Sequence, residues 1–265
     1  MSNENVVTGV EESASGPRIQ KITLSDLKEA ISLGIADFNT KPSHLVFLAL
    51  IYPIIGVVLA RFAFGYEVLP LLFPLIAGFA LIGPLAATGM YEMSRRIEKN
   101  LEISWRRAFD VLRSHSILSI SMLGFIQTGI FVGWLFAANA IYVSIFGDAT
   151  PASLKEFAVD IFTTPEGMNL ILIGSGVGFL FAVLVLSISV VSFPMLLDRD
   201  VSAFMAVKTS VRSVIVNPVI MLVWGFIVAC ALVIGSIPFF VGLAVVMPIL
   251  GHATWHLYRK VVARG

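Results

Sequence analysis

Residues 83–116 decide the fold, and they read GPLAATGMYEMSRRIEKNLEISWRRAFDVLRSHS. The stretch begins inside one long apolar run and ends at the start of the next. Between the two runs lie basic side chains: Arg95, Arg96, Lys99, Arg106, Arg107 and Arg113. A short connection rich in Lys and Arg stays on the cytoplasmic side of a membrane, because such loops resist translocation. The stretch therefore predicts a membrane protein and orients its chain.

Composition supports the membrane assignment. Hydrophobic residues make up 57% of the 265-residue chain and charged residues only 13%, against about 25% charged in soluble domains. The apolar residues occur in blocks long enough to cross a bilayer as helices. We therefore predict an all-α polytopic membrane protein, with a disordered polar tail over residues 1–20 and a single membrane domain over residues 21–265. The net charge of +1 gives no ground for a nucleic-acid partner.

Six transmembrane helices fit the apolar runs and the placement of charge. The runs cover approximately residues 44–64, 68–91, 116–146, 169–193 and 219–258. The last run suits a hairpin of two spans with its turn at Gly235–Pro238. Every Lys and Arg except Arg61 and Lys155 then lies on the side that holds both termini, in line with the positive-inside rule. The alternative has five spans and a last run that only dips into the membrane, which would place Arg259 and Lys260 outside.

Three amphipathic helices are predicted at the cytoplasmic interface, each before a pair of spans. The first covers residues 22–38 and has one apolar face made of Leu27, Ile31, Ile35 and Phe38. The second lies in the basic loop, with an apolar face made of Ile97, Leu101, Trp105, Ala108, Phe109 and Leu112. The third begins at residues 201–202, and its apolar face is made of Phe204, Val207 and Val211. This order indicates three helix-plus-hairpin repeats. Alternatively, the three helices are alike only because any amphipathic helix before a span looks similar.

The basic loop is the candidate contact surface. Tryptophan suits the headgroup level of a bilayer, and arginines attract anionic headgroups at about 1 kcal/mol each. We expect contact with membrane lipid or with other membrane proteins at Arg95, Arg96, Lys99, Trp105, Arg106, Arg107 and Arg113.

Two stripes of small residues are candidate packing surfaces. One stripe is Gly129, Gly133 and Ala137, and the other is Gly174, Gly178 and Ala182. Small residues four apart let the backbones of membrane helices approach closely. We expect the two stripes to face each other; contacts with other spans, with another protomer, or with nothing are the alternatives.

The four histidines all fall on the cytoplasmic side. His252 and His256 are four residues apart on one helical face, a spacing that lets two imidazoles share a metal or haem. No Cys, Asp or Glu accompanies them in the sequence, so we expect interfacial rings, and no metal or other cofactor, at His252, His256, His44 and His115. No catalytic signature is present either, so the sequence predicts a protein that is not an enzyme.

The basic stretch also carries a family resemblance. Its motifs are Gly83-Pro84, then Thr88–Glu92, Ser94-Arg95-Arg96 with Glu98, and Ser104-Trp105-Arg106 with Ala108-Phe109. These motifs resemble the bacterial integral membrane family catalogued as domain of unknown function 2189, and the likeness extends over most of the chain from about residue 30. Similar sequences often have an acidic residue where this chain has Arg107, and glycine where it has Asn100. The resemblance implies an inner-membrane location and no established activity.

The favoured function is therefore that of a non-enzymatic scaffold or accessory subunit in the inner membrane, binding lipid and membrane-protein partners. The alternative is a transporter of small solutes or lipid. Between the interfaces the expected spans contain no Asp, Glu, Lys or Arg. Ion-coupled carriers usually need such a residue, so its absence argues against a proton-coupled pump.

Overall fold

The computed structural model describes residues 17–40, 56, 70–147, 151, 153–238 and 241–263. Within these ranges the chain is helical, which confirms the predicted all-α class. The elements are α2 (Leu24–Thr40), α4 (Leu72–Ala86), α5 (Thr88–Glu98), η2 (Trp105–Arg113), α6 (Ile117–Phe146), α7 (Leu154–Thr163), α8 (Pro165–Ser189), α9 (Ser192–Asp198), α10 (Ala203–Val216), α11 (Pro218–Ser236) and α12 (Leu243–Val261).

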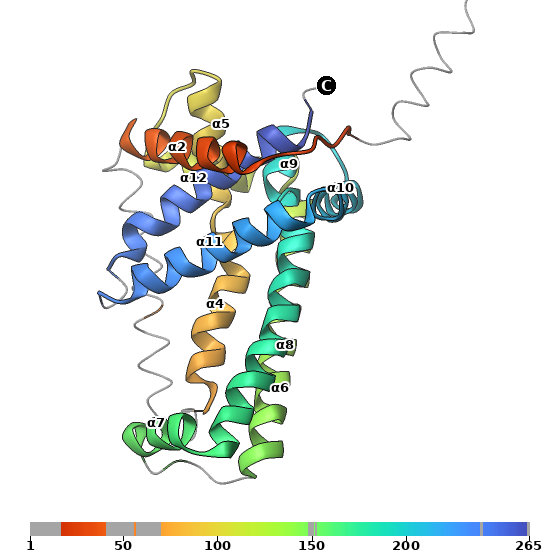
Figure 1. Cartoon of the computed structure of the whole chain (residues 1–265). Helices are drawn as coiled ribbons and strands as arrows, with labels where there is room; N and C mark the ends of the chain where they lie inside the picture. Colours follow the sequence, from red (N-terminus) through yellow and green to blue (C-terminus); the bar gives the residue numbers. More distant parts are fainter. Residues whose placement is uncertain are drawn as a thin grey trace, which may run out of the picture.

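Long apolar helices form the body of the molecule. In Figure 1, α4, α6 and α8 run along one common axis, while α11 and α12 slant across it. Among the described residues, three helical segments are long and apolar enough to cross a membrane: Ile117–Phe146, Pro165–Asp198 and Pro218–Ser236. The chain is therefore an integral membrane protein. The first expected span, residues 44–64, lies outside the described residues except for Gly56, and neither α4 nor α12 is among the three segments, so the count of six stays a prediction.

Two expected spans have different bounds. The second was expected to continue to residue 91 through a kink at Pro84, but α4 ends at Ala86 and α5 begins at Thr88. The fourth was expected to stop at Pro194, but the span continues through α9 to Asp198. Pro194 lies in the first turn of α9, where its missing N–H removes no intrahelical bond.

Four elements and one helix end form the cap, which we define as α2, α5, η2, α9 and the C-terminal half of α12. The cap lies at one end of the long helices, with α2 across α12 (Figure 1). Its centre is closely packed, because Phe193 and Leu196 of α9 and Trp255 and Leu257 of α12 are fully buried. The largest buried core of the described residues thus lies in the cap and reaches the adjoining ends of α6 and α11.

The buried face of α2 differs from the expected one. It is made of Leu27, Ala30, Gly34 and Asp37, whereas Ile35 is 41% exposed. The cause is the close crossing with α12, because a Cβ on Gly34 would lie 2.7 Å from the backbone nitrogen of Ala253. At this crossing Gly34, not Ile35, therefore faces the neighbouring helix.

The last residues of the expected disordered tail are ordered. Ile19 forms an antiparallel bridge with Val262, and the N–H of Gln20 donates to the carbonyl of Val261 at 2.8 Å. Asn217, at the start of α11, accepts from the N–H of Ile22 at 2.9 Å and so fixes the entry to α2. Both ends of the described chain meet in the cap.

The basic loop is not one continuous amphipathic helix. Asn100 has a φ of 52°, and α5 ends just before it. An extended segment follows, and Trp105–Arg113 forms a 3₁₀ helix. The apolar face expected from Ile97 to Leu112 is therefore divided between two elements. Because the second amphipathic unit differs in kind from α2 and α10, the three-unit repeat stays a prediction.

Candidate functional site

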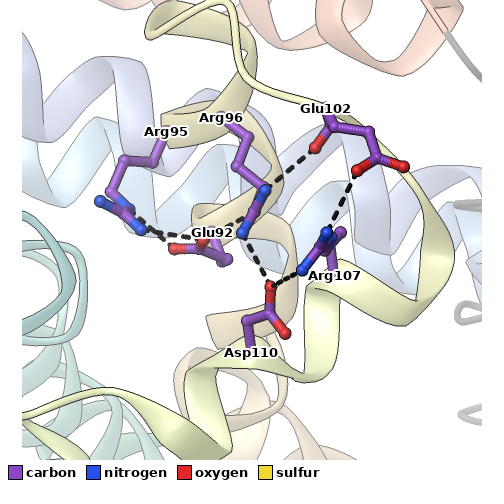
Figure 2. A network of polar contacts seen from close by, with 6 residues as sticks. All are labelled: Glu92, Arg95, Arg96, Glu102, Arg107 and Asp110. Atoms are coloured by element: carbon purple, nitrogen blue, oxygen red, sulfur yellow. Dashed lines mark hydrogen bonds and ion pairs between the residues drawn. The ribbon is translucent and has the colours of Figure 1, made fainter.

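Six charged residues of the basic loop form one network, the basic-loop network: Glu92, Arg95, Arg96, Glu102, Arg107 and Asp110 (Figure 2). At its centre Glu92 is only 3% exposed and accepts from two guanidinium groups. Arg95 Nε donates to Glu92 Oε2 at 2.7 Å, and Arg96 Nε donates to Oε1 at 2.9 Å. A buried carboxylate is thus neutralised by two cations from its own helix.

Arg96 also joins α5 to η2. Its Nη2 donates to Asp110 Oδ2 at 2.7 Å, and its Nη1 donates to the carbonyl of Glu102 at 3.0 Å. Arg107 closes the outer side, with Nη2 at 3.1 Å from Glu102 Oε2 and Nη1 at 3.5 Å from Asp110 Oδ2. The Arg107 side chain is 45% exposed against 13% for Arg96, so the network has an inner and an outer arginine.

The expected contact residues therefore separate into groups. Arg95 and Arg96 are engaged inside the cap, while Arg107 is paired but accessible. Lys99 and Arg113 are exposed and make no ion pair with any residue that the structure describes. The side chains of Trp105 and Arg106 lie outside the described set. Contact with lipid or a partner stays a prediction for all of them.

A second ionic cluster holds the end of α12. Arg259 donates to Glu98 Oε1 at 2.7 Å and to Asp198 Oδ2 at 2.8 Å. Tyr258 donates to the same oxygen of Asp198 at 2.7 Å. Lys260 Nζ lies 2.8 Å from Glu29 Oε2. Arg259 and Lys260, which were expected on the side that holds both termini, therefore bind α2, α5 and α9.

The histidine cluster comprises Asp37, Ser94, His252 and His256. The Oδ2 of Asp37 lies 2.6 Å from Ser94 Oγ and 2.8 Å from His256 Nε2, and Ser94 Oγ lies 2.6 Å from His252 Nδ1. With Asp37 ionised, the hydroxyl of Ser94 donates to the carboxylate, and Nδ1 of a neutral His252 donates to the hydroxyl. Burial is the main cause that lowers the pKa of His252 to about 4, which keeps the ring neutral.

Sequence reasoning missed the acidic member of this cluster. The expectation that no carboxylate accompanies the histidines is wrong, because α2 brings Asp37 to them from more than 200 residues away. His115 lies elsewhere, 3.7 Å from Asp200, and His44 is outside the described residues. In the described part of the chain, no three His, Cys, Asp or Glu residues are grouped so that they could hold a metal ion. The absence of metal and haem stays a prediction.

The two small-residue stripes do not pack with the glycines of one against the glycines of the other, as had been expected. A Cβ on Gly178 would lie 3.1 Å from the ring of Trp134, and one on Gly133 would lie 3.8 Å from Phe181. The rings of Trp134 and Phe181 are 5.6 Å apart at their centroids. Among the described residues nothing lies within 4 Å of a Cβ on Gly129 or Gly174. Helices α6 and α8 therefore pack through aromatic rings.

One stripe instead lines a cavity. The central cavity, which we define as the space of about 920 Å³ between α4, α6, α8, α11 and α12, has Gly174, Gly178 and Ala182 in its wall, and Gly56 of the first expected span also lines it. Gly83 of α4 and Gly225 of α11 lie across from them. The four-residue spacing correctly placed the three small residues on one face of the helix. Such spacing cannot distinguish a packing surface from a cavity wall. Ala137 of the other stripe is half-buried on α6 and is not part of this wall.

Comparison with known proteins agrees with this architecture. A family model described as "Predicted integral membrane protein (DUF2189)" matches residues 71–198, which include the basic-loop network and two of the three spans. The match is shorter than the resemblance that the sequence motifs indicated from about residue 30. Searches of curated proteins and of solved structures give no match. Over residues 71–198, just under half of its length, the chain thus matches the DUF2189 family of predicted integral membrane proteins.

Proposed function

We propose that the protein is a non-enzymatic scaffold or accessory subunit of the bacterial inner membrane, with its cap on the cytoplasmic side. In this proposal the outer side of the basic loop binds anionic headgroups and membrane-protein partners. The observation that carries it is that some basic side chains of the loop are ion-paired inside the cap, whereas others are accessible. Arg95 and Arg96 bind the buried Glu92, and Arg96 also joins α5 to η2, while Arg107, Arg113 and Lys99 remain accessible.

The accessible cations lie on elements that also expose apolar side chains. Leu112 is 64% exposed and Phe109 is 46% exposed on the same short helix as Arg113. On α10, Phe204 is 76% exposed and Lys208 is also exposed. Cations beside exposed apolar groups suit a surface that lies among headgroups, because the apolar groups enter the acyl boundary and the cations bind phosphate.

The test is headgroup selectivity of the purified protein. Native mass spectrometry from mixed micelles would compare retained phosphatidylglycerol with phosphatidylcholine for wild type and for the Lys99→Gln/Arg113→Gln variant. We expect wild type to prefer the anionic lipid. The variant should lose about 1 kcal/mol of that preference per cation, or about fivefold each.

Lys155→Gln is the matched control, since Lys155 is exposed on α7, at the other end of the long helices (Figure 1). It should leave the selectivity unchanged. Equal retention of both lipids by wild type, or equal loss in the control, would contradict the headgroup role. Partner binding is tested separately by pull-down in a gentle detergent with the same variants.

A lipid transporter is the second candidate, and the central cavity favours it over a carrier of polar solutes. No Asp, Glu, Lys, Arg or His lies among the described residues of the cavity wall. Flux of labelled lipid between the leaflets of proteoliposomes, without any partner, would favour the transporter over the scaffold.

A further inference from the structure

We propose that the central cavity is a binding site for the acyl chains of one membrane phospholipid. This site is separate from the basic loop, so it does not depend on the headgroup contacts of the proposed function. Its volume of about 920 Å³ falls in the usual range for sites that enclose a small molecule, about 300–1,000 Å³. Such sites commonly lie between the helices of a bundle.

The cavity exists because small residues from several helices face the same space. Gly174, Gly178 and Ala182 come from α8, Gly83 from α4 and Gly225 from α11. A Cβ on Gly83 or Gly174 would meet no described atom within 4 Å, so neither glycine is needed for close packing between the described helices. Protein interiors are otherwise close-packed. Trp134 and Leu186 already lie 3.1 Å and 3.3 Å from the Cβ positions of Gly178 and Gly225, so the space left between the described helices is at Gly83 and Gly174.

The described part of the wall has no charged side chain and few hydroxyls, Tyr91 and Ser175 among them. The hydroxyls of Ser189, Ser236 and Thr254 donate to carbonyls four residues earlier in their own helices. Such internal bonds leave the donors satisfied without a ligand. A polar solute would lose its hydration here and find few partners, which costs free energy. A hydrocarbon chain needs no polar partners, so it does not incur this cost.

Several wall residues are exposed apolar side chains on or beside helices that are long and apolar enough to cross a membrane. Phe179 is on the span that contains α8, Phe226 is on the α11 span, and Ile237 follows it. These side chains are 56%, 70% and 74% exposed. An apolar space that opens between two membrane-spanning helices is reached by acyl chains without passing through water. The occupant to which these observations point is therefore a phospholipid chain.

Tryptophan fluorescence gives a direct measurement. Trp134 and Trp224 line the cavity and are almost fully buried. The delipidated full-length protein would be titrated in detergent micelles with a phosphatidylcholine brominated in the middle of its acyl chains, because bromine quenches nearby indoles. We expect quenching that saturates at one lipid per chain, and native mass spectrometry should show one retained phosphatidylcholine.

Two variants would fill the cavity from different helices. Ala182→Phe on α8 and Ala229→Phe on α11 each add a ring to the wall. Each should weaken saturable quenching by about tenfold or more, as expected for an overfilled apolar site. Ala140→Phe, at an exposed position of α6 outside the wall, is the matched control and should bind as wild type does. Using two variants keeps the test valid if one does not fold.

The outcomes are distinct. Quenching that rises without saturation, or that both filling variants leave unchanged, would overturn the proposal. So would the absence of any lipid uptake, which is the result expected if another part of this chain fills the cavity. Lys99→Gln/Arg113→Gln should not alter phosphatidylcholine quenching, so failure of this site and failure of the headgroup role can be told apart.

Discussion

At the scale of single residues, burial decides what each charged group does. Glu92 and Glu102 are ten positions apart in one loop, yet Glu92 is buried between two arginines and the Glu102 side chain is 71% exposed. A buried ion pair is costly to break because the remaining charge is uncompensated, whereas an exposed pair contributes little. The same contrast separates Arg96 from Arg107.

Arg96→Gln should therefore destabilise the protein. Arg95 still faces Glu92 in this variant, so we expect a cost near the lower end of the range for broken buried pairs, about 3 kcal/mol. The measurement is thermal unfolding in detergent. Adding Glu92→Gln should recover part of the loss, and Arg107→Gln is the control with a much smaller effect. Equal losses for Arg96→Gln and Arg107→Gln would show that burial is not the cause.

His252 should make stability depend on pH. Burial lowers the pKa of His252 from its ordinary value of 6.5 to about 4 in the folded protein, so the neutral ring is favoured by folding. The groups that face it are Asp37 of α2, Ser94 of α5 and His256 of its own helix. The stabilisation is complete above pH 6.5 and is lost as the pH falls toward 4, by up to about 3 kcal/mol.

Unfolding in guanidinium chloride across this pH range would check the histidine. His252→Gln should flatten the curve between pH 6.5 and 4, because glutamine does not titrate. His115→Gln, at a side chain that is 55% exposed, should leave the curve unchanged. A wild-type stability that is constant over this window would contradict the assignment of a buried neutral ring.

At the scale of elements, close approach between helices occurs where both partners are small, and one such place is the crossing of α2 and α12. There Gly34 faces the backbone of Ala253. Between α6 and α8 the glycines instead receive aromatic rings. Both arrangements use small residues, but only the first requires a glycine at that position.

Gly34→Ala tests this distinction. Alanine forms helix more readily than glycine by about 1 kcal/mol, so the substitution would stabilise a helix with free space around it. Because the new Cβ would lie 2.7 Å from the backbone nitrogen of Ala253, we expect destabilisation by about 1–3 kcal/mol instead. Gly129→Ala, with no described atom within 4 Å of its Cβ, is the control. Opposite signs in thermal unfolding are the expected result, and two stabilised variants would contradict the close crossing.

At the scale of the whole molecule, charge is concentrated at one end of the long helices. The basic-loop network, the histidine cluster and the α12 ion pairs all belong to the cap, while the far end carries α7 with Glu156 and Asp160 (Figure 1). Positive charge near one end is the usual determinant of orientation. We therefore expect the cap, and with it both termini, to face the cytoplasm.

Reporter fusions test the orientation and the number of spans. A reporter after Gly265 should behave as cytoplasmic, and one inserted at Pro151 should behave as periplasmic. A periplasmic C-terminus would mean an odd number of spans, as in the five-span alternative. A cytoplasmic signal at Pro151 would contradict the assignment of the basic loop.

The sequence by itself determined the membrane location, the helical class and three of the spanning helices, because hydropathy and helix length are properties of contiguous residues. It also identified the basic stretch by which the family is recognised, and the small-residue stripe of α8. Only the tertiary structure decided what those residues do. Asp37 reaches His256 and Arg259 reaches Glu98 from distant helices, and the stripe at Gly174–Ala182 lines a cavity. The reason is physical: burial, ion pairing and cavity formation depend on which helix faces which, and one-dimensional periodicity fixes only the face of each helix, not its neighbour.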